Sequence, residues 1–279
     1  MEKMHIIFDT EKCVGCYNCL LACQDEFIGN NWLPYTEAQE RHGEKWLKTT
    51  RHERGKAPIT EVAFVTEMCR HCENAACEKA FPDAVIHRDD GIVLLNPHKA
   101  KGNKDLVKAC PYGMIKWNEE RQTAQKCTMC AHLLDEGWAE PRCVQACPLR
   151  ALSVVKCSDE EFAQLVDRQK LKPLECGSNK PHLLYRGLHK INSVFIYGAV
   201  VRREKGIERA VEGVNVVLRM NGELITSAVT DFFGEFKIDR IPKNSGTFEL
   251  TVSNNGAVKC VISVEVGESC PDIGVITID

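Results

Sequence analysis

The stretch Cys13-Val-Gly-Cys16-Tyr-Asn-Cys19-Leu-Leu-Ala-Cys23 decides how the first half of this 279-residue chain folds. Thiols spaced by two residues can converge on three corners of one iron–sulfur cube, while the peptide amides turn inward toward the sulfurs. Gly15 eases the tight turn that this convergence requires. The fourth thiol, Cys23, is spaced to reach a neighbouring cluster. The stretch therefore predicts one iron–sulfur cluster and one ligand of a second.

A matching group of cysteines lies much later in the chain, and the two groups together predict two 4Fe-4S clusters. It reads Cys127-x-x-Cys130 and then Cys143-x-x-x-Cys147-Pro148, the ending typical of ferredoxins. In such modules the last thiol of each group binds the cluster of the other group. The expected ligands are Cys13, Cys16, Cys19 and Cys147, which we name set A, and Cys23, Cys127, Cys130 and Cys143, which we name set B.

The middle of the chain holds a group that has lost half of its cysteines. Cys69, Cys72, Cys77 and Cys110 predict the ligands of one further 4Fe-4S cluster, which we name set C. A complete two-cluster module would also have cysteine at Phe81, Ala100, Asn103 and Leu106, which together would ligate one cluster. None of the four is cysteine, so twelve of the sixteen cysteines account for three clusters of four ligands each.

Other interpretations of the cysteines are weaker. Neighbours this close in sequence suit a metal centre better than a disulfide framework, and although CxxC pairs also bind zinc, the longer runs are ferredoxin spacings. Cys157, Cys176, Cys260 and Cys270 lie outside the three sets, and as small apolar side chains they are predicted to be buried packing residues.

Several polar residues stand beside expected ligands. His71 and His132 are predicted to make hydrogen bonds around the clusters and not to bind iron. Four cations next to ligands either raise cluster potentials by their charge or lie on the solvated surface; they are Lys12, Arg70, Lys126 and Arg142.

The predicted fold class is α+β, with ferredoxin-like iron–sulfur modules followed by an all-β sandwich. Residues 1–157 form the expected ferredoxin-type domain, with short strands at His5–Phe8 and Gly91–Leu95. Residues 158–190 are expected as a helical connector, opened by a capping box at Ser158 and Glu161 with a helix that runs toward Lys170.

Residues 191–279 alternate apolar and polar side chains with period two, which predicts strands of a transthyretin-like or immunoglobulin-like sandwich. Turn signals such as Asn221-Gly222 separate these runs. The segment Thr230–Phe236 places a glycine turn within an expected strand pair, and it resembles transthyretin-like and carboxypeptidase-regulatory-like modules. The expected role of this domain is support or interaction. The inward-facing positions of three strands are Val214, Val216 and Leu218; Phe248, Leu250 and Val252; and Cys260, Ile262, Val264 and Val266.

Charge and hydropathy exclude several function classes. The net charge is −3, and the cations are scattered, so nucleic acid is not an expected partner. The longest apolar run, Val194–Val201, is far short of the roughly 20 residues of a membrane-spanning helix. The start, Met1–Asp9, has no secretory h-region, so we expect a cytoplasmic location, or export together with a partner that carries the signal.

Three motifs resemble the iron–sulfur subunits of the dimethyl sulfoxide reductase superfamily of molybdenum and tungsten pterin enzymes. They are Cys69-Arg-His-Cys72-Glu-Asn-Ala-Ala-Cys77, Ala109-Cys-Pro-Tyr-Gly113 and Lys126-Cys-Thr-Met-Cys130-Ala-His-Leu-Leu-Asp135. The lost cluster and the β tail are similar to one branch of it, the small subunits of pyrogallol-phloroglucinol transhydroxylases, phenol hydroxylases and catechol dehydroxylases. Asn31-Trp32, Gln39-Glu40-Arg41, Trp46 and Arg51-His-Glu-Arg54-Gly55 also resemble that branch.

This resemblance implies a non-catalytic electron-transfer subunit. Its partner would be a large chain with a molybdenum or tungsten bis-pterin guanine dinucleotide cofactor that acts on phenolic aromatics, in a heterodimer or larger assembly. The insertion 24–62 would dock that chain through Trp32, Trp46, Arg41 and Arg54, or else it is a folded surface loop.

Two other functions stay open from the sequence. The chain could relay electrons in another molybdopterin reductase or dehydrogenase, or it could be a scaffold in which clusters are structural cross-links without a redox role. An autonomous enzyme is the weakest interpretation, because each cluster has a full set of cysteine ligands and no nucleophile, base or phosphate loop stands out.

Overall fold

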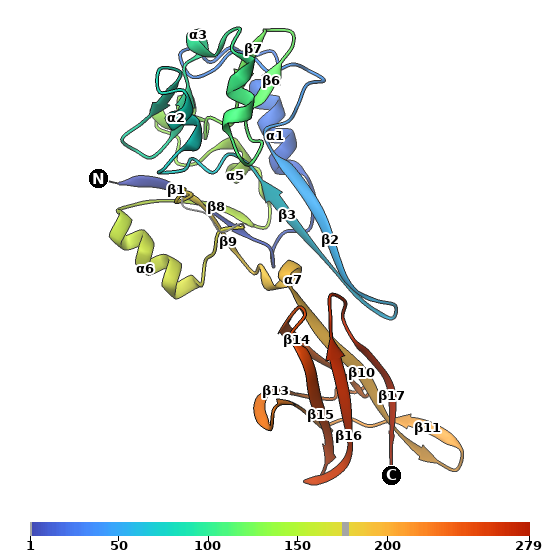
Figure 1. The fold of residues 1–279 in the computed structure, drawn as a ribbon. Coiled ribbons are helices and arrows are strands. Elements are labelled where there is room, and N and C mark those ends of the chain that lie inside the picture. Colours follow the sequence, from blue (N-terminus) through green and yellow to red (C-terminus); the bar gives the residue numbers. More distant parts are fainter. Residues whose placement is uncertain (1, 175–178) are drawn as a thin grey trace. The chain divides into compact units, whose positions relative to one another are not determined.

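The computed structural model describes residues 2–174 and 179–279, which form two compact units. Unit 1 comprises residues 1–51 and 63–188, and unit 2 comprises residues 52–62 and 189–279. Figure 1 shows the many short elements of unit 1 and the long strands of unit 2.

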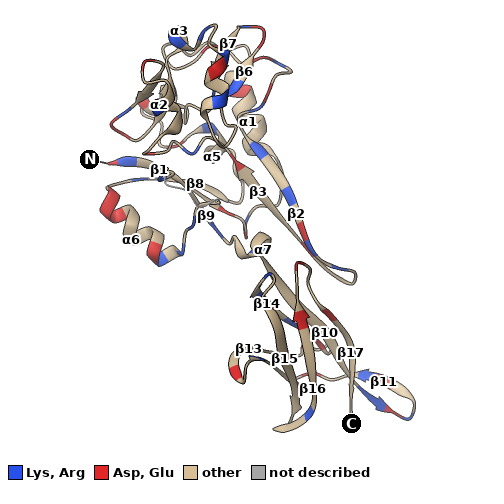
Figure 2. Cartoon of the chain, in the orientation of Figure 1, with Lys and Arg blue, Asp and Glu red and all other residues tan. Residues whose placement is uncertain are grey.

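Unit 1 is built on a three-stranded sheet in the order β8 (Leu152–Cys157), β1 (Lys3–Asp9), β9 (Leu183–Arg186). Strand β1 pairs antiparallel with β8 and parallel with β9. Helix α6 (Asp159–Gln169) packs on this sheet through Phe162, which joins Ile7 and Leu184 in one apolar cluster. The acidic first turn of α6, red in Figure 2, suits the positive end of the helix dipole.

The cysteine-bearing part of unit 1 has little regular structure, as expected where metal centres replace much of an apolar core. A hairpin of β2 (Lys48–Lys56) and β3 (Ile59–Glu67) runs from unit 1 into unit 2. The remaining elements are α1 (Asn18–Phe27), α2 (Ala76–Ala80), β4 (Val85–His87), β5 (Val93–Leu95), α3 (Pro97–Ala100), the 3-10 helix η1 (Lys104–Ala109), β6 (Lys116–Asn118), β7 (Thr123–Gln125), α4 (Ala131–Asp135) and α5 (Arg142–Gln145).

The local expectations for this unit are confirmed. Both short strands form, and Ser158 accepts the Glu161 amide while the Glu161 side chain accepts the Ser158 amide, which completes the capping box. Helix α6 ends at Lys170 as its C-cap. The segment expected as a connector contributes α6 and β9 to unit 1, because both add apolar side chains to its sheet.

Unit 2 is a sandwich of two four-stranded sheets. In the first sheet, β10 (Ser193–Glu204) pairs with β14 (Glu235–Pro242), β11 (Ile207–Ala210) and β17 (Asp272–Ile278). The second sheet has the order β13 (Glu223–Val229), β12 (Asn215–Met220), β15 (Gly246–Asn254), β16 (Ala257–Val266). The short helix α7 (His189–Asn192) precedes β10.

The period-two pattern correctly identified the inner face of the second sheet. Eight of the ten side chains expected to point inward are buried in one core with residues of β10 and β14, and Cys260 and Ile262 pack against that core partly exposed. The Asn221-Gly222 turn joins β12 to β13 with positive φ at both residues, the conformation that tight hairpins favour.

The expectation that the Thr230–Phe236 turn lies within a strand pair is wrong. Strands β13 and β14 lie in different sheets, so the turn crosses from one sheet to the other. Asp231 holds it by accepting the amides of Phe233 and Glu235. Gly234 has a φ of +73°, and a Cβ there would lie 2.4 Å from the Val200 carbonyl oxygen, so only glycine fits.

The tip of the β2–β3 hairpin, residues 52–62, belongs to unit 2. Ile59 packs against the sandwich core, and the Tyr197 hydroxyl donates to the Lys56 carbonyl at 3.4 Å. Nothing in the local sequence indicated this, because the partners lie far along the chain.

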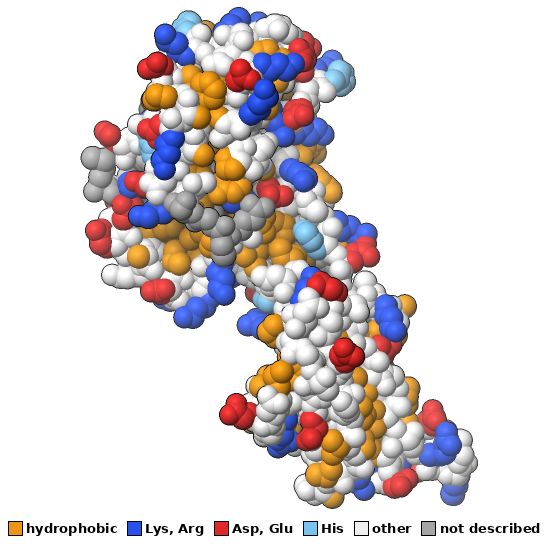
Figure 3. Space-filling model, in the orientation of Figure 1, with side chains coloured by type: hydrophobic (Ala, Val, Ile, Leu, Met, Phe, Trp, Pro, Cys, Tyr) orange, Lys and Arg blue, Asp and Glu red, His pale blue; other side chains and the backbone are white. Residues whose placement is uncertain are grey.

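Across the described residues, no helix is both long and apolar enough to cross a membrane. On the face drawn in Figure 3, basic and acidic side chains are interspersed over each unit.

Candidate iron–sulfur centres

The loop before α1 gives set A its shape. Gly15 takes a φ of +69°, and a Cβ on it would lie 2.5 Å from the Phe64 ring, so the loop lies flush against β3. Tyr17 also has a left-handed conformation, as the residue that caps α1. These two turns let Cys13, Cys16 and Cys19 approach one cavity.

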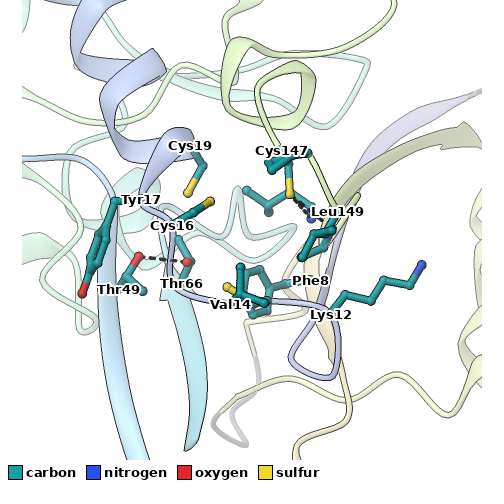
Figure 4. Close-up of a pocket in the computed structure, with 15 residues that line it drawn as sticks. Phe8, Lys12, Val14, Cys16, Tyr17, Cys19, Thr49, Thr66, Cys147 and Leu149 are labelled. Atoms are coloured by element: carbon teal, nitrogen blue, oxygen red, sulfur yellow. Dashed lines mark hydrogen bonds between the residues drawn. The ribbon is translucent and has the colours of Figure 1, made fainter.

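All four cysteines of set A line one cavity. In Figure 4, Cys16 and Cys19 come from the α1 side and face Cys147 across the cavity. The Cys147 sulfur accepts the amides of Ala151 at 3.2 Å and Leu152 at 3.5 Å. Burial raises the pKa of the Cys19 thiol to about 11, and the charge of Cys13 adds to the rise.

The four cysteines of set B are all buried, with 5–7 % of their surface exposed. Burial raises the pKa of Cys23 well above the ordinary thiol value, and the charges of Cys127, Cys143 and Cys130 raise it further. Burial likewise raises the pKa of Cys130 to about 12. The Cys127 sulfur accepts the Met129 amide at 3.3 Å.

All four cysteines of set C line a second cavity. Burial raises the pKa of Cys72 to about 12, and the charges of Cys69 and Cys110 contribute. The Cys110 sulfur accepts the Met114 amide at 3.4 Å.

The donor chemistry of the sets suits iron–sulfur clusters. Burial raises the pKa of all four thiols of set B, of Cys13 and Cys19 in set A, and of Cys72 and Cys77 in set C. Such thiols would stay protonated at neutral pH unless a cationic core compensated their charge, and iron supplies that charge. Backbone amides directed at the sulfurs are the usual outer partners of such clusters. Each set therefore fits a cluster held by four thiolates.

Sets A and B adjoin at α1, which carries both Cys19 and Cys23. Sets B and C adjoin at Lys126, whose Nζ donates to the Cys127 carbonyl at 3.2 Å and to the Cys69 sulfur at 3.5 Å. Burial and the charges of the other set B thiolates raise the pKa of Cys23 and Cys143 most, and the charge of Cys19 from set A raises both further. Burial and then the charge of Cys69 from set C raise the pKa of Cys127 to about 11. Set B is thus the middle member.

The four positions at which a further cluster would need cysteine are occupied by packing residues. Ala100 and Leu106 are buried in a core cluster with Val93 and Ile115, and Phe81 packs against it. Asn103 is partly buried and donates its amide to Ala100. The substituted positions have therefore become part of the ordinary core of the module.

Of the four cations beside the ligands, two lie at least partly at the solvated surface and two are buried near the clusters' expected ligands. Lys12 is exposed and extends away from the cavity in Figure 4, and Arg142 is half-buried. Lys126 and Arg70 are buried, with 3 % and 5 % of their surface exposed, and the Arg70 guanidinium lies 3.5 Å from the centre of the Tyr112 ring.

The neighbouring histidines are hydrogen-bonded within the chain, and the described spare cysteines are buried or partly buried. The His132 ring pairs with Glu26 at 2.9 Å, and His71 Nδ1 accepts the Val93 amide at 3.1 Å. Cys157 and Cys270 are buried and Cys260 is partly exposed, whereas Cys176 lies outside the described residues.

Two of the four anchors expected in the insertion serve the chain's own packing. Trp46 is 3 % exposed and packs on Phe27, and the Arg54 side chain is 8 % exposed and ion-paired. Trp32 stacks on His132 and remains partly exposed, and Arg41 is exposed. Only the last two can offer surface to a partner.

Sequence reasoning missed an apolar rim around set A. Val14, Leu149 and Tyr17 line its cavity although they are 61 %, 48 % and 44 % exposed, and Leu21 follows one helical turn later at 59 %. We name these four residues the collar. Cys16, at its centre, is the one exposed cysteine among those described. The available signal was that apolar or aromatic residues, Val14, Tyr17 and Leu21, stand between the cysteines of the first group.

Comparison with known families agrees with this site. Residues 60–157 match the family described as 4Fe-4S dicluster domain. That range holds all of set C and four ligands of sets A and B. Unit 1 is thus a ferredoxin-type domain that carries 4Fe-4S clusters.

Three curated proteins show the range of relatives. The pyrogallol hydroxytransferase small subunit of Pelobacter acidigallici is 38 % identical over 276 residues, covering 96 % of this chain and 98 % of the relative. The arsenate respiratory reductase iron-sulfur subunit ArrB of Shewanella sp. (strain ANA-3) is 27 % identical over 66 % of this chain and 95 % of its own. The B subunit of the anaerobic dimethyl sulfoxide reductase of Escherichia coli (strain K12) is 34 % identical over 52 % of this chain and 69 % of its own.

Proposed function

Because this protein belongs to the family of the pyrogallol hydroxytransferase small subunit, we propose that it carries three 4Fe-4S clusters and relays electrons for a catalytic partner. The clusters are held by sets A, B and C. When bound, such clusters accept and release single electrons. The observation that carries the proposal is the arrangement of the three cysteine sets in series, with one end at the surface.

The chain's own residues insulate and direct this path. All four cysteines of set B are buried, which supports a middle member without contact to solvent. Set A opens to the surface at Cys16, inside the collar. We therefore place the exchange of electrons with the partner at set A.

The partner we propose is a large chain with a molybdenum or tungsten bis-pterin cofactor, and its substrates are phenolic aromatics. Support for the substrate class comes from the relative that spans nearly the whole chain, unit 2 included. The relatives that are reductase subunits match a smaller share, which favours a second candidate, a relay in another molybdopterin reductase, less strongly. The holoenzyme would act in the cytoplasm, or after export with a signal-bearing partner, and cell fractionation distinguishes the two.

Anaerobic purification of the native assembly tests this function. We expect about 12 iron atoms per chain, four for each of three clusters, and molybdenum or tungsten on a larger co-purifying chain. Phenolic substrates should be consumed by that assembly. Zinc in place of iron, or a chain without a large partner, would refute the proposal.

A substitution in the collar tests the docking site. Leu149→Glu should weaken binding of the catalytic chain at least roughly tenfold, because a carboxylate would lose its water inside an apolar contact. Binding is measured by titrating the separated chains under anaerobic conditions. Leu224→Glu, at a residue of unit 2 that is 65 % exposed, is the matched control and should leave affinity unchanged. Equal affinity of both variants would remove the collar from the interface.

A further inference from the structure

Lys126 is a buried cation between sets B and C. Only 3 % of the residue is exposed. Its Nζ donates to the Cys69 sulfur of set C at 3.5 Å and to the Cys127 carbonyl of set B at 3.2 Å. The third acceptor is the Val93 carbonyl. The hydrogen bonds to the sulfurs of Cys110, Cys127 and Cys147 come instead from backbone amides.

These contacts define the charge of the side chain. Three acceptors match the three N–H groups of an ammonium, one more than a neutral amine offers. No carboxylate pairs with Lys126 among the residues that the structure describes. A buried ammonium without a counter-charge is costly, so its charge must be balanced by the anionic group that the adjacent thiolates hold.

His71 provides a second donor to the same cavity. It lines the cavity of set C and is 1 % exposed. Because Nδ1 accepts the Val93 amide, the ring proton lies on Nε2. That Nε2 has no hydrogen-bond partner among the described residues. A sulfide or thiolate of a cluster in the cavity is the acceptor that such a buried N–H requires.

The groups that donate hydrogen bonds to the cysteine sulfurs differ between set C and sets A and B. The sulfur hydrogen bonds found in them come from backbone amides, at Cys147 and Cys127. Set C has such an amide at Cys110 and adds a cationic side chain and a histidine N–H. Since reduction adds negative charge to a cluster, donors and cations beside it favour the reduced form.

We propose that Lys126 and His71 raise the reduction potential of the cluster in set C above those of sets A and B, which makes set C the electron store of the chain. Set C lies at the far end of the series from the collar. Beyond it, the place of a fourth cluster is occupied by the apolar core around Leu106, so no further cluster draws the electron away. This inference rests on the proposed function.

Redox titration of the anaerobic holoenzyme, followed by electron paramagnetic resonance, tests it. In Lys126→Gln, electron affinity at one cluster should fall at least tenfold, which is 59 mV for one electron, and the other two should change less. His71→Phe should shift the same cluster in the same direction. Lys126→Arg, which keeps the charge, should restore most of the potential.

A matched control and a second measurement keep the test decisive. Lys108→Gln removes an 83 % exposed cation of the same module and should shift no potential. If Lys126→Gln loses iron, replacing single cysteine ligands with serine shows instead which cluster has the highest potential. An oxygen ligand lowers the potential of the cluster that it binds. Cys77→Ser should then move the highest potential, and Cys16→Ser should not.

The possible outcomes separate this inference from the proposed function. Three clusters with unchanged potentials in Lys126→Gln, or a highest potential that follows Cys16→Ser, would overturn the electron store and leave the relay intact. A wild-type chain without iron would overturn both.

Discussion

Replacing both Cys130 and Cys143 with alanine should remove about four of about twelve iron atoms per chain and disconnect set C from set A. Set B is the middle of the series, and all of its cysteines are buried. With two thiolates gone, a cluster there keeps only half of its ligands. Electrons entering at the collar should then reduce the set A cluster alone.

The measurement is iron analysis together with substrate-driven reduction of the holoenzyme, frozen at intervals for electron paramagnetic resonance. In the wild-type assembly all clusters should respond to substrate. In the double variant the signal of set C should fail to appear, although a small-molecule reductant still reduces it. This contrast separates an interrupted path from a missing cluster.

Cys157→Ala is the matched control. Cys157 is also buried in unit 1, but it packs on α6 with Ile7 and Phe162 and belongs to no set. It should keep about twelve irons. If the double variant also kept them, or if substrate still reduced set C at the wild-type rate, the series order would be wrong.

The features of both units that depend on local sequence patterns could be predicted from the sequence. Cluster ligation is a local demand, because three thiolates must come from one short loop, so spacing alone grouped the cysteines that line the cavities of sets A and C. Alternation of side chains is local too, and it located the inner faces of β12, β15 and β16.

Features that depend on distant partners could not be read from the sequence. Whether Lys126 is solvated or buried is decided by Cys69 and Val93, which lie in other segments. Trp46 resembled an interface anchor until its contact with Phe27 was known. The same holds for Arg54, whose hydrogen bond to Asp239 spans 185 positions.

Arg54 gives the second large prediction, because it ties the hairpin tip to the sandwich within unit 2. Its guanidinium bonds Glu61 at 2.6 Å and both carboxylate oxygens of Asp239 at 2.8 and 2.9 Å. It also lies 5.1 Å from the centre of the Phe195 ring, and Lys237 pairs with the same Glu61. Arg54→Met should lower the free energy of unfolding of unit 2 by about 3 kcal/mol, because Asp239 loses its main partner and Glu61 keeps only Lys237.

Hydrogen exchange of the intact chain localises the effect. Amides of β10 and β14 should exchange roughly a hundredfold faster in Arg54→Met, the equivalent of about 3 kcal/mol. This expected loss of stability is at the lower end of the usual cost of breaking a buried ion pair, since Glu61 and Asp239 are 28 % and 29 % exposed.

The ion pairs also predict a pH dependence with a definite sign. Burial alone would raise the pKa of Glu61, but hydrogen bonds from Lys237 and Arg54 outweigh it and lower the pKa. Burial alone would also raise the pKa of Asp239, but hydrogen bonds, chiefly from Arg54, outweigh it and lower the pKa. A carboxylate with a lowered folded pKa stabilises above its unfolded pKa and loses that contribution as pH falls through the folded value. Protection of β14 should therefore decline below about pH 4 in the wild type.

In Arg54→Met this acid dependence should weaken, because the carboxylates regain pKa values closer to those of the unfolded chain. The control is Arg203→Met, whose pair with Glu208 is 63 % and 47 % exposed and should contribute less than about 1 kcal/mol. If Arg54→Met exchanged like that control, Arg54 would add no stability to unit 2. The hairpin tip would then be held by its apolar contacts alone, chiefly Ile59 against the sandwich core.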